Sequence, residues 1–273
     1  MEKSANIFRF KKFQVVNECS AMKVNTDGVL LGAAMTIRAQ DRRLLDIGTG
    51  TGTIALMAAQ RLEGEIPDQV GDDSHERVGD DVGGGVVIDA VEIDGPSAVE
   101  AAANFSNSPW PHVLNAYNMS LDRFAAEIAG TDVSYDLIFS NPPYFEDSQM
   151  APDSRKSTAR HTGLTRSGRL SEGLSYRDIF DFAAGRLTED GRVALILPAD
   201  QEAALTRYAR MSGLHLFRIL RIRTVPRKAP IRIVAEFSRY RCETPQDEML
   251  TIMNEGKYTE EYLSLIRDFY LFA

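Results

Sequence analysis

The sequence predicts an α/β fold in which a mostly parallel sheet of seven strands carries helices on both faces. Short apolar runs rich in β-branched residues alternate with longer segments of helical character along most of the 273 residues. The chain is 44% hydrophobic and 26% charged, which is typical of a globular protein that buries a full core. No apolar run reaches the roughly 20 residues that a membrane-spanning helix needs.

The predicted elements follow one another in the order that a parallel sheet requires. Strands are expected at Arg43–Ile47, Val86–Ile93, His112–Tyr117, Tyr135–Ser140, Arg192–Leu197, His215–Arg223 and Ile231–Arg239. Helices are expected at Thr53–Arg61, Pro96–Phe105, Leu121–Ala129, Tyr176–Leu187 and Gln201–Met211. A loop with proline, arginine and lysine separates the last two strands. These two strands are therefore expected to form an antiparallel end of the sheet.

One main domain is expected at residues 41–273, preceded by an N-terminal extension at residues 1–40. An acidic insertion at residues 64–85 interrupts it. Between Glu63 and Asp81 there are eight acidic residues and one base, Arg77, so this stretch carries −7 of the net charge of −8. The insertion is rich in Asp and Gly and poor in apolar residues, which predicts a disordered-like surface segment.

Cysteine and histidine usage gives no sign of a metal site. Cys19 and Cys242 lie far apart and match no metal-ligand spacing, and the four histidines form no evident cluster. The N-terminal residues MEKSANIFRFKKF lack the apolar segment and cleavage site of a secretory signal. We therefore expect a cytoplasmic protein with free thiols, without metal and without a membrane partner, and we expect it to be a monomer.

A glycine-rich turn follows the strand Arg43–Ile47. After Asp46 the glycines stand at alternate positions, in the order Gly48, Thr49, Gly50, Thr51, Gly52. Glycine adopts positive φ and lets a ligand approach the backbone, and the next helix directs its N-terminus to the same place. Such a turn by itself is compatible with NAD, FAD, S-adenosylmethionine or a purely structural role.

An acidic residue at the end of the next strand narrows this choice. Glu92 stands where a carboxylate can accept hydrogen bonds from both ribose hydroxyls of an adenosine. Together with Asp46-x-Gly-x-Gly-x-Gly, it resembles motif I and the acidic motif of Rossmann-like class I methyltransferases, whereas a dinucleotide site would normally begin Gly-x-Gly-x-x-Gly. S-adenosylmethionine is the expected cofactor, bound by Asp46, Gly48, Thr49, Gly50, Thr51, Gly52, Glu92 and Ile93.

The strand Tyr135–Ser140 runs directly into Asn141, Pro142, Pro143 and Tyr144, which are the expected catalytic residues. Prolines fix φ and remove backbone donors, so the Asn141 amide oxygen and the Pro142 carbonyl can each accept one N–H of a planar amino group. Tyr144 offers a face on which a flipped base can stack. Methyl transfer from a sulfonium needs alignment more than a strong base. The motif predicts methylation of an amino group. The target can be the amino group of adenine, that of guanine or the side-chain amide of a glutamine.

Several further segments carry a family resemblance. They are Phe10–Phe13, Ala21–Gly32, LLDIGTGTGTIALMAAQR, VEIDGPSAVEAAANFSNSPW, SNPPYF, Asp190–Arg192, Leu197-Pro198, Tyr258–Tyr262 and Arg267–Leu271. The chain resembles the bacterial tRNA adenine-N6 methyltransferases that modify valine tRNA beside the anticodon, at position 37. The resemblance covers nearly the full chain except residues 64–85, and it implies that tRNA is the substrate.

The resemblance also implies individual residue roles. Lys23, Thr26, Asp27 and Gly28 would close over the cofactor from the N-terminal extension, and Asn141 would border the cofactor as well as the target base. The family usually has an Asp-Ile pair at the cofactor adenine, and here the corresponding residues are Ser120 and Leu121. Ser120 or the nearby Asp122 would then take over the contact that the family's Asp makes.

Two basic segments predict where RNA would bind. Gly213–Ile233 contains arginines and a lysine without any acid, and Phe145–Ser175 contains a second basic group. The expected RNA-binding residues are Arg155, Lys156, Arg160, Arg221, Arg223, Arg227 and Lys228. A charged run is also a common solvated surface, and phosphate contacts do not identify a particular tRNA.

Two other functions are compatible with parts of this pattern. A methyltransferase of protein glutamine would normally carry a helical N-terminal domain, whereas about 40 residues precede the glycine turn here. A methyltransferase-like RNA-binding protein without catalysis would not need the intact Asn141–Tyr144 motif. Methylation of the N6 amino group of a tRNA adenine is therefore the predicted function.

Overall fold

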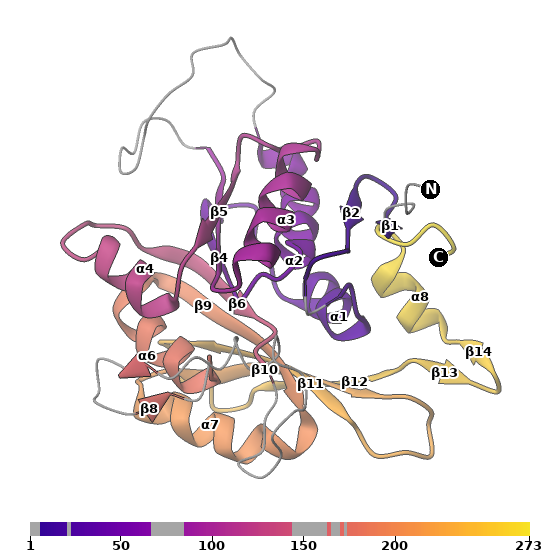
Figure 1. Cartoon of the computed structure of the whole chain (residues 1–273). Coiled ribbons are helices and arrows are strands. Elements are labelled where there is room, and N and C mark those ends of the chain that lie inside the picture. The colour runs from indigo at the N-terminus through magenta and orange to yellow at the C-terminus, as the bar shows by residue number, and fades with distance from the viewer. Residues whose placement is uncertain (1–5, 21–22, 67–84, 144–162, 165–169, 172–173) are drawn as a thin grey trace.

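An eight-stranded sheet lies at the centre of the computed structural model (Figure 1). The structure describes residues 6–20, 23–66, 85–143, 163–164, 170–171 and 174–273. The strands are β3 Arg43–Ile47, β4 Val87–Glu92, β5 Leu114–Asn118, β6 Tyr135–Ser140, β9 Leu187–Pro198, β10 His215–Arg223, β11 Arg232–Ser238 and β12 Gln246–Thr251. They lie in the order β12-β10-β11-β9-β6-β3-β4-β5. The strands from β5 to β9 are parallel, whereas β11 is antiparallel to both β9 and β10.

The predicted fold class is confirmed, and the last two predicted strands form its antiparallel end. The strands β3, β6 and β10 begin and end at the predicted residues. The predicted number of seven strands becomes eight, because β12 lies at the edge of the sheet, parallel to β10. Its sequence, QDEMLT, buries only Leu250, so it shows none of the apolar periodicity that indicates a strand. Ion pairs from Asp247 and Glu248 to arginines of β10 help to hold it there.

Helices cover both faces of the sheet (Figure 1). One face packs against α1 Thr26–Ala34, α2 Thr53–Arg61, α3 Gly95–Ser106 and α8 Glu260–Ile266, and the other against α4 Leu121–Glu127, α6 Tyr176–Arg186 and α7 Glu202–Met211. Alternate side chains of each strand enter the two apolar cores: Leu44 belongs to the first core and Leu45 to the second. Each central strand is therefore buried on both faces, which explains its continuous apolar sequence.

Helix α1 lies within the region that the sequence assigned to an N-terminal extension. Asn25 caps it: its Oδ1 accepts a hydrogen bond from the Gly28 amide at 2.8 Å. Val29, Leu30 and Leu31 are consecutive and all buried, so this helix shows no amphipathic period that a sequence search would detect. Residues 28–34 of this helix therefore contribute to the core beside the sheet.

Arginine side chains satisfy carbonyl groups at the C-terminal end of α1. Arg61 donates to the carbonyls of Gly32 and Met35, and Arg218 donates to that of Ala34. Arg192 donates to the carbonyl of Thr36, just beyond the helix. Cations are favourable at this end of a helix, and the last carbonyls have no partner within it. The three arginines come from α2, β9 and β10, so they fix α1 against the sheet.

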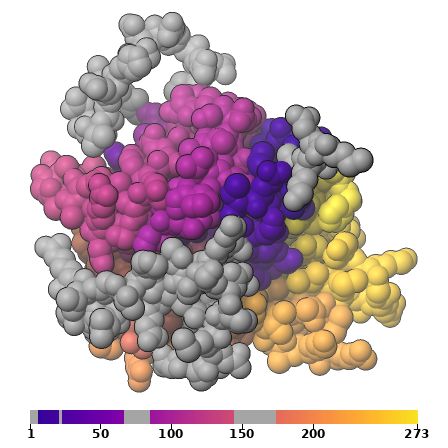
Figure 2. All heavy atoms as spheres, viewed as in Figure 1, coloured from indigo at the N-terminus to yellow at the C-terminus, as the bar shows by residue number. Residues whose placement is uncertain are grey.

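The two ends of the described chain pack together. The hairpin of β1 Ile7–Arg9 and β2 Gln14–Val16 lies beside the segment after α8, as Figures 1 and 2 show. The Lys11 amide donates to the Phe269 carbonyl at 2.8 Å, and the Lys11 ammonium donates to the carbonyl of Arg267. Phe10 also stacks on Phe13 and on Tyr270. The first and last described residues therefore belong to the same folded unit as the sheet.

Smaller elements complete the described chain. They are the strands β7 Gly163–Leu164, β8 Leu170–Ser171, β13 Met253–Asn254 and β14 Lys257–Tyr258, and the 3-10 helices η1 Glu63–Glu65 and η2 Ala199–Gln201. Most of the predicted acidic insertion, residues 67–84, lies outside the described residues. Helix α2 also has the predicted bounds, and the remaining predicted strands and helices shift by a few residues at one or both ends. The largest change is β9, which begins at Leu187 where Arg192 was predicted.

Candidate active site

The ends of three neighbouring strands meet at one edge of the sheet. The Ser140 hydroxyl at the end of β6 donates to the Ile47 carbonyl at the end of β3, at 2.6 Å. The amides of Gly48 and Thr49 both donate to the carbonyl of Val91 in β4, at 2.8 and 3.2 Å. These bonds fix the glycine turn between the two flanking strands. The carboxyl edge of a parallel sheet is where α/β proteins usually bind ligands.

The glycine turn needs its glycines. Gly48, Gly50 and Gly52 have φ values of 73°, 58° and 82°, a region that side chains other than glycine rarely adopt. A Cβ at Gly52 would also lie 2.4 Å from Cε1 of Phe105 in α3. Gly52 is the N-cap of α2, so the turn ends where the free amide groups of that helix begin.

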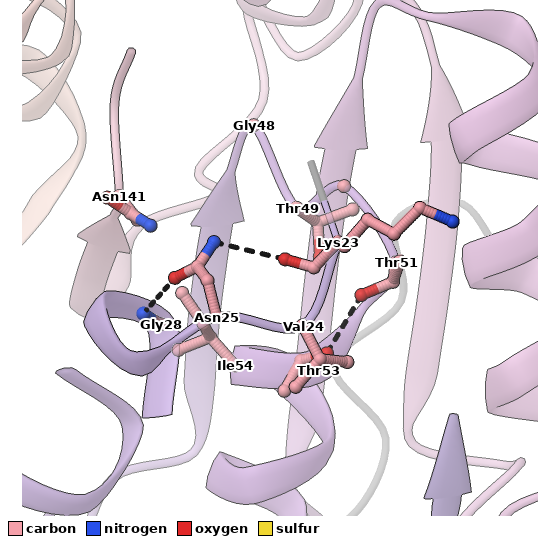
Figure 3. A pocket seen from close by; sticks show the side chains of 11 residues that line it. Lys23, Val24, Asn25, Gly28, Gly48, Thr49, Thr51, Thr53, Ile54 and Asn141 are labelled. Carbon is pink, nitrogen blue, oxygen red and sulfur yellow. Dashed lines mark hydrogen bonds between the residues drawn. The ribbon is translucent and has the colours of Figure 1, made fainter. Parts of the chain in front are cut away.

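A cavity that opens to solvent lies in front of this turn (Figure 3). Its empty space of about 350 Å³ includes solvent at the opening. Its walls combine seven of the predicted residues, namely Lys23, Gly28, Gly48, Thr49, Gly50, Thr51 and Asn141. The sequence prediction missed four further lining residues, Val24, Asn25, Thr53 and Ile54. Asn25 is an N-cap residue type, but Thr26, Asp27 and Gly28 separate it from the apolar run that begins at Val29, so the sequence gives only a weak signal for it.

The N-terminal wall of the cavity is built around Asn25. Its Nδ2 donates to the Lys23 carbonyl at 3.1 Å, while its Oδ1 caps α1 (Figure 3). The Lys23 ammonium donates to the Asn17 carbonyl at 2.7 Å. Asp27 accepts a hydrogen bond from Arg232 Nε at 2.8 Å, and Thr26 is exposed. Lys23 and Gly28 therefore line the cavity, while Asp27 connects α1 to β11.

Glu92 supports the glycine turn from the side of β4. Its Oε2 accepts a hydrogen bond from the Gly50 amide at 2.9 Å, and its Oε1 accepts one from Asp94 at 2.8 Å. Burial raises the pKa of this carboxyl above its ordinary value, and the two backbone amides oppose the rise. Each carboxylate oxygen has a second lone pair, so the side chain retains capacity to accept further hydrogen bonds.

Asp46 is fully buried behind the turn. Its Oδ2 accepts a hydrogen bond from the Thr49 hydroxyl at 2.6 Å, and its Oδ1 has no hydrogen-bond partner among the described residues. Burial raises its pKa to about 7, against the lowering effect of the Thr49 hydroxyl. Its visible contact is with the turn, and it is not among the residues that line the cavity.

The predicted catalytic motif begins at this cavity. Asn141 is a lining residue with 6% of its surface exposed, and its amide group faces the side on which Asn25 lies (Figure 3). Pro142 is buried and Pro143 is half-buried directly after it. Tyr144 lies outside the described residues. The structure therefore brings Asn141 and the glycine turn to one cavity, although 90 residues separate them.

The remaining residues predicted at the cofactor are Ile93, after β4, and the expected adenine contacts Ser120 and Leu121, after β5. Ile93 is 39% exposed directly after β4. Ser120 is the N-cap of α4, and its Oγ accepts a hydrogen bond from the Arg123 amide at 3.2 Å. Leu121 is half-buried at the start of the same helix, and Asp122 is exposed. Their contact with a cofactor stays a prediction.

The predicted RNA-binding residues differ in their surroundings. Arg155, Lys156 and Arg160 lie outside the described residues. Arg221 forms ion pairs with Glu202 at 2.5 Å and Asp247 at 2.9 Å, and Arg223 donates to the Thr251 hydroxyl and the Pro226 carbonyl. Arg227 and Lys228 are exposed in the turn between β10 and β11. Within the described part of the chain, no ion pair is present at these last two.

The described residues contain neither a candidate metal site nor a candidate membrane-spanning helix. No group of three or more His, Cys, Asp or Glu side chains there could hold a metal ion. Among those residues there is also no helix with the length and apolar character that crossing a membrane requires.

Comparison with curated proteins found relatives that match nearly the whole chain. A tRNA1(Val) (adenine(37)-N6)-methyltransferase from Parabacteroides distasonis is 36% identical over 97% of this chain and 97% of its own length. Proteins of the same name from Bacteroides fragilis and Salmonella typhi are each 34% identical over 98% of this chain, and 99% and 96% of their own lengths. No family model matches the chain.

Solved structures support the fold. A predicted O-methyltransferase from Agrobacterium tumefaciens aligns with a TM-score of 0.59 at 17% identity, over 89% of this chain and 96% of that one. A SAM-dependent methyltransferase from the same organism aligns with a TM-score of 0.52 at 11% identity, over 88% and 72%. At such low identity the likeness concerns the fold alone.

Proposed function

The chain belongs to the tRNA1(Val) (adenine(37)-N6)-methyltransferases, and from this premise we propose that it methylates the N6 amino group of an adenine in tRNA. The methyl donor is S-adenosylmethionine, and the substrate position that the relatives' name indicates is adenine 37 of a valine tRNA. The observation that carries the proposal is the placement of Asn141 and the glycine turn at one cavity.

The residues around the cavity fit this cofactor. Three glycines with positive φ let a ligand approach the backbone of the turn closely, and α2 directs its N-terminal amide groups to the same place. Glu92 stands at the end of β4 with lone pairs available for ribose hydroxyls. The residues that would hold the cofactor are Lys23, Gly28, Gly48, Thr49, Gly50, Thr51, Glu92 and Asn141, with Ser120 and Leu121 toward the adenine. When bound, S-adenosylmethionine supplies an electrophilic methyl group on a positively charged sulfur.

The protein's role in the reaction is to hold the target amino group. The Asn141 side-chain oxygen and the Pro142 carbonyl would each accept one of its hydrogens, which fixes the direction of the nitrogen lone pair. Pro142 and Pro143 restrict the backbone here, so these acceptors lose little entropy when the base enters. Tyr144 would stack on the extruded base. Holding the amino group and the methyl group in the geometry of the reaction raises the rate of methyl transfer.

For the tRNA, Arg227 and Lys228 are the best supported phosphate contacts. Both are exposed, whereas the charge of Arg221 is already balanced by Glu202 and Asp247. Arg155, Lys156, Arg160 and Arg223 are proposed as further contacts. The N-terminal extension would close over the cofactor through Lys23 to Gly28, and the enzyme would act as a cytoplasmic monomer.

Nucleoside mass spectrometry tests the proposed reaction. Purified protein, a valine tRNA transcript and methyl-labelled S-adenosylmethionine should yield labelled N6-methyladenosine. A transcript with guanine at position 37 should yield none. Label in another nucleoside, or in glutamine of an added protein, would overturn the proposal.

Variants test the role of Asn141. Asn141→Ala removes one of the two acceptors and should lower the single-turnover rate about a hundredfold. Asn254→Ala, an exposed change on β13, serves as the matched control and should leave the rate unchanged. A rate for Asn141→Ala close to that of the parent protein would remove Asn141 from the mechanism.

A further inference from the structure

Helix α3 carries a row of buried polar side chains that the proposed reaction does not use. Ser97, Glu100 and Asn104 are 3%, 6% and 2% exposed. Their spacing of three and four residues places them on one face of the helix. Burying such groups is costly unless each has hydrogen-bond partners. Their partners lie in the N-terminal segment of residues 16–20 and in the glycine turn.

Glu100 binds three consecutive backbone amides. Its Oε1 accepts hydrogen bonds from Glu18 at 2.6 Å and Cys19 at 2.9 Å, and its Oε2 accepts one from Ser20 at 3.0 Å. Hydrogen bonds to a carboxylate are shorter and stronger than those between neutral groups. One side chain therefore fixes the course of residues 18–20.

Asn104 joins the same segment to the glycine turn. Its Oδ1 accepts from the Val16 amide at 2.8 Å, and its Nδ2 donates to the Val16 carbonyl at 3.0 Å. The same Nδ2 donates to the Thr51 carbonyl at 2.9 Å. Ser97 adds a bond from its hydroxyl to that of Ser20 at 3.2 Å.

These contacts connect two walls of the cavity. Thr51 is part of the glycine-turn wall, and Lys23, Val24 and Asn25 form the N-terminal wall that follows residues 16–20 along the chain. The Lys23 ammonium also donates to the carbonyl of Asn17, within the segment that Glu100 and Asn104 hold. The separation of the two walls thus depends on α3.

We propose that Glu100 and Asn104 are positioning residues that hold the N-terminal wall of the cofactor site at its working distance from the glycine turn. Neither residue lines the cavity. Asn104 acts on it through Thr51, a lining residue, and Glu100 acts through residues 18–20, which lead into the N-terminal wall. This inference rests on the proposed function, because it assigns the cavity to the cofactor. It predicts that substitution of either Glu100 or Asn104 lowers the affinity for the cofactor without lowering kcat or the affinity for tRNA.

Glu100→Gln tests the inference with little change of shape. The glutamine amide nitrogen cannot accept from a backbone amide, so at least one of the three hydrogen bonds is lost and the charge is removed. Without RNA, titration calorimetry should show S-adenosylmethionine affinity weakened about tenfold. The KM for the cofactor should rise by the same factor, while kcat and the KM for tRNA stay within about twofold.

Asn104→Asp provides a second variant that separates the functions of one side chain. Its carboxylate still accepts from the Val16 amide but cannot donate to the carbonyls of Val16 and Thr51. The cofactor affinity should again fall while kcat is retained. Should Glu100→Gln fail to fold, this variant decides the question by itself.

A core substitution controls for general loss of stability. Ile222→Val removes one methyl group from a fully buried residue of β10, away from α3. It should lower the melting temperature without changing cofactor affinity. Parent-like affinity in folded Glu100→Gln and Asn104→Asp proteins would overturn the inference and leave the proposed function standing. Failure of the parent protein to bind S-adenosylmethionine would instead overturn the proposed function.

Discussion

The Ser140 hydroxyl donates a hydrogen bond to the Ile47 carbonyl at 2.6 Å, and both residues are buried. Ser140 directly precedes Asn141, and Ile47 directly precedes the first glycine of the turn. This bond therefore joins the strand that leads into the Asn141 motif to the strand that opens the glycine turn. In the proposed reaction, the bond would fix the distance between the two parts of the site that must be aligned for methyl transfer.

Ser140→Ala should weaken both the fold and the alignment. Losing one buried hydrogen bond should lower the free energy of unfolding by about 1 kcal/mol. We expect the single-turnover rate to fall by a larger factor than the equilibrium constant for folding does, because small displacements of reacting groups are costly. Urea denaturation and single-turnover methylation measure the two effects. A parent-like rate at reduced stability would show that the bond has only a structural role.

Glu92→Gln should weaken cofactor binding while sparing the turn. The remaining amide oxygen can still accept from Gly50, but a carboxylate contact to the ribose is lost, which is worth roughly 1.5–3 kcal/mol. Titration calorimetry without RNA should therefore show affinity reduced by about ten- to a hundredfold. Glu127→Gln, a surface change on α4, is the control. Equal affinities for Glu92→Gln and the parent would mean that the ribose is held elsewhere.

Asp46 should make the stability of the protein depend on pH. Its pKa in the folded protein is about 7, raised by burial, whereas an unfolded chain has an ordinary Asp pKa of about 3.9. From pH 4 to 7 the unfolded state loses this proton while the folded state keeps it, so stability falls as pH rises. Between pH 5 and 8 the loss should be about 3 kcal/mol relative to Asp46→Asn.

Chemical denaturation of both proteins at those two pH values measures this difference. The Thr49 hydroxyl can still donate to the oxygen of the asparagine, so the variant isolates the ionisation. If the difference in unfolding free energy between the parent and Asp46→Asn is the same at both pH values, the pKa of Asp46 is not raised in the folded protein.

Replacing Arg227 and Lys228 by Ala should raise the KM for tRNA without changing cofactor affinity. Each lost phosphate contact reduces the slope of log affinity against log salt by about 0.7 to 0.9. Filter binding over a salt series measures the slope. Arg207→Ala, an exposed change on α7, should leave it unchanged. An unchanged slope for the double variant would exclude this turn from the RNA interface.

Residues 67–84 should be removable. Six acids and one base lie there among glycines, and such a composition contributes little to a core. Ile66 packs against the apolar core, so the deletion should begin after it, with a short Gly-Ser link to Gly85. Melting temperature and methylation rate should stay close to those of the parent. A large fall in the melting temperature would mean that the segment is packed.

Most strands and helices, and both motifs, could be predicted from the amino-acid sequence. Strands β3 and β6 were predicted with their bounds, because their continuous apolar residues are typical of strands buried on both faces. The glycine turn and the Asn141 motif could be placed at strand ends because both follow those runs directly. Family resemblance then indicated the reaction, which the curated relatives support.

The contacts between residues far apart in the chain could not be predicted, because they depend on how the fold brings segments together. Arg221 lies in an acid-free stretch of sequence, yet Glu202 and Asp247 balance its charge in the fold. Strand β12 escaped prediction because it is a polar edge strand, and helix α1 escaped because its residues 28–32 are buried in succession and show no amphipathic period. The contacts of Glu100 and Asn104 with residues 16–20 and Thr51 span 53 to 88 positions. Periodicity reports the surroundings of a segment, whereas hydrogen bonds and charge pairs depend on which segments the sheet brings together.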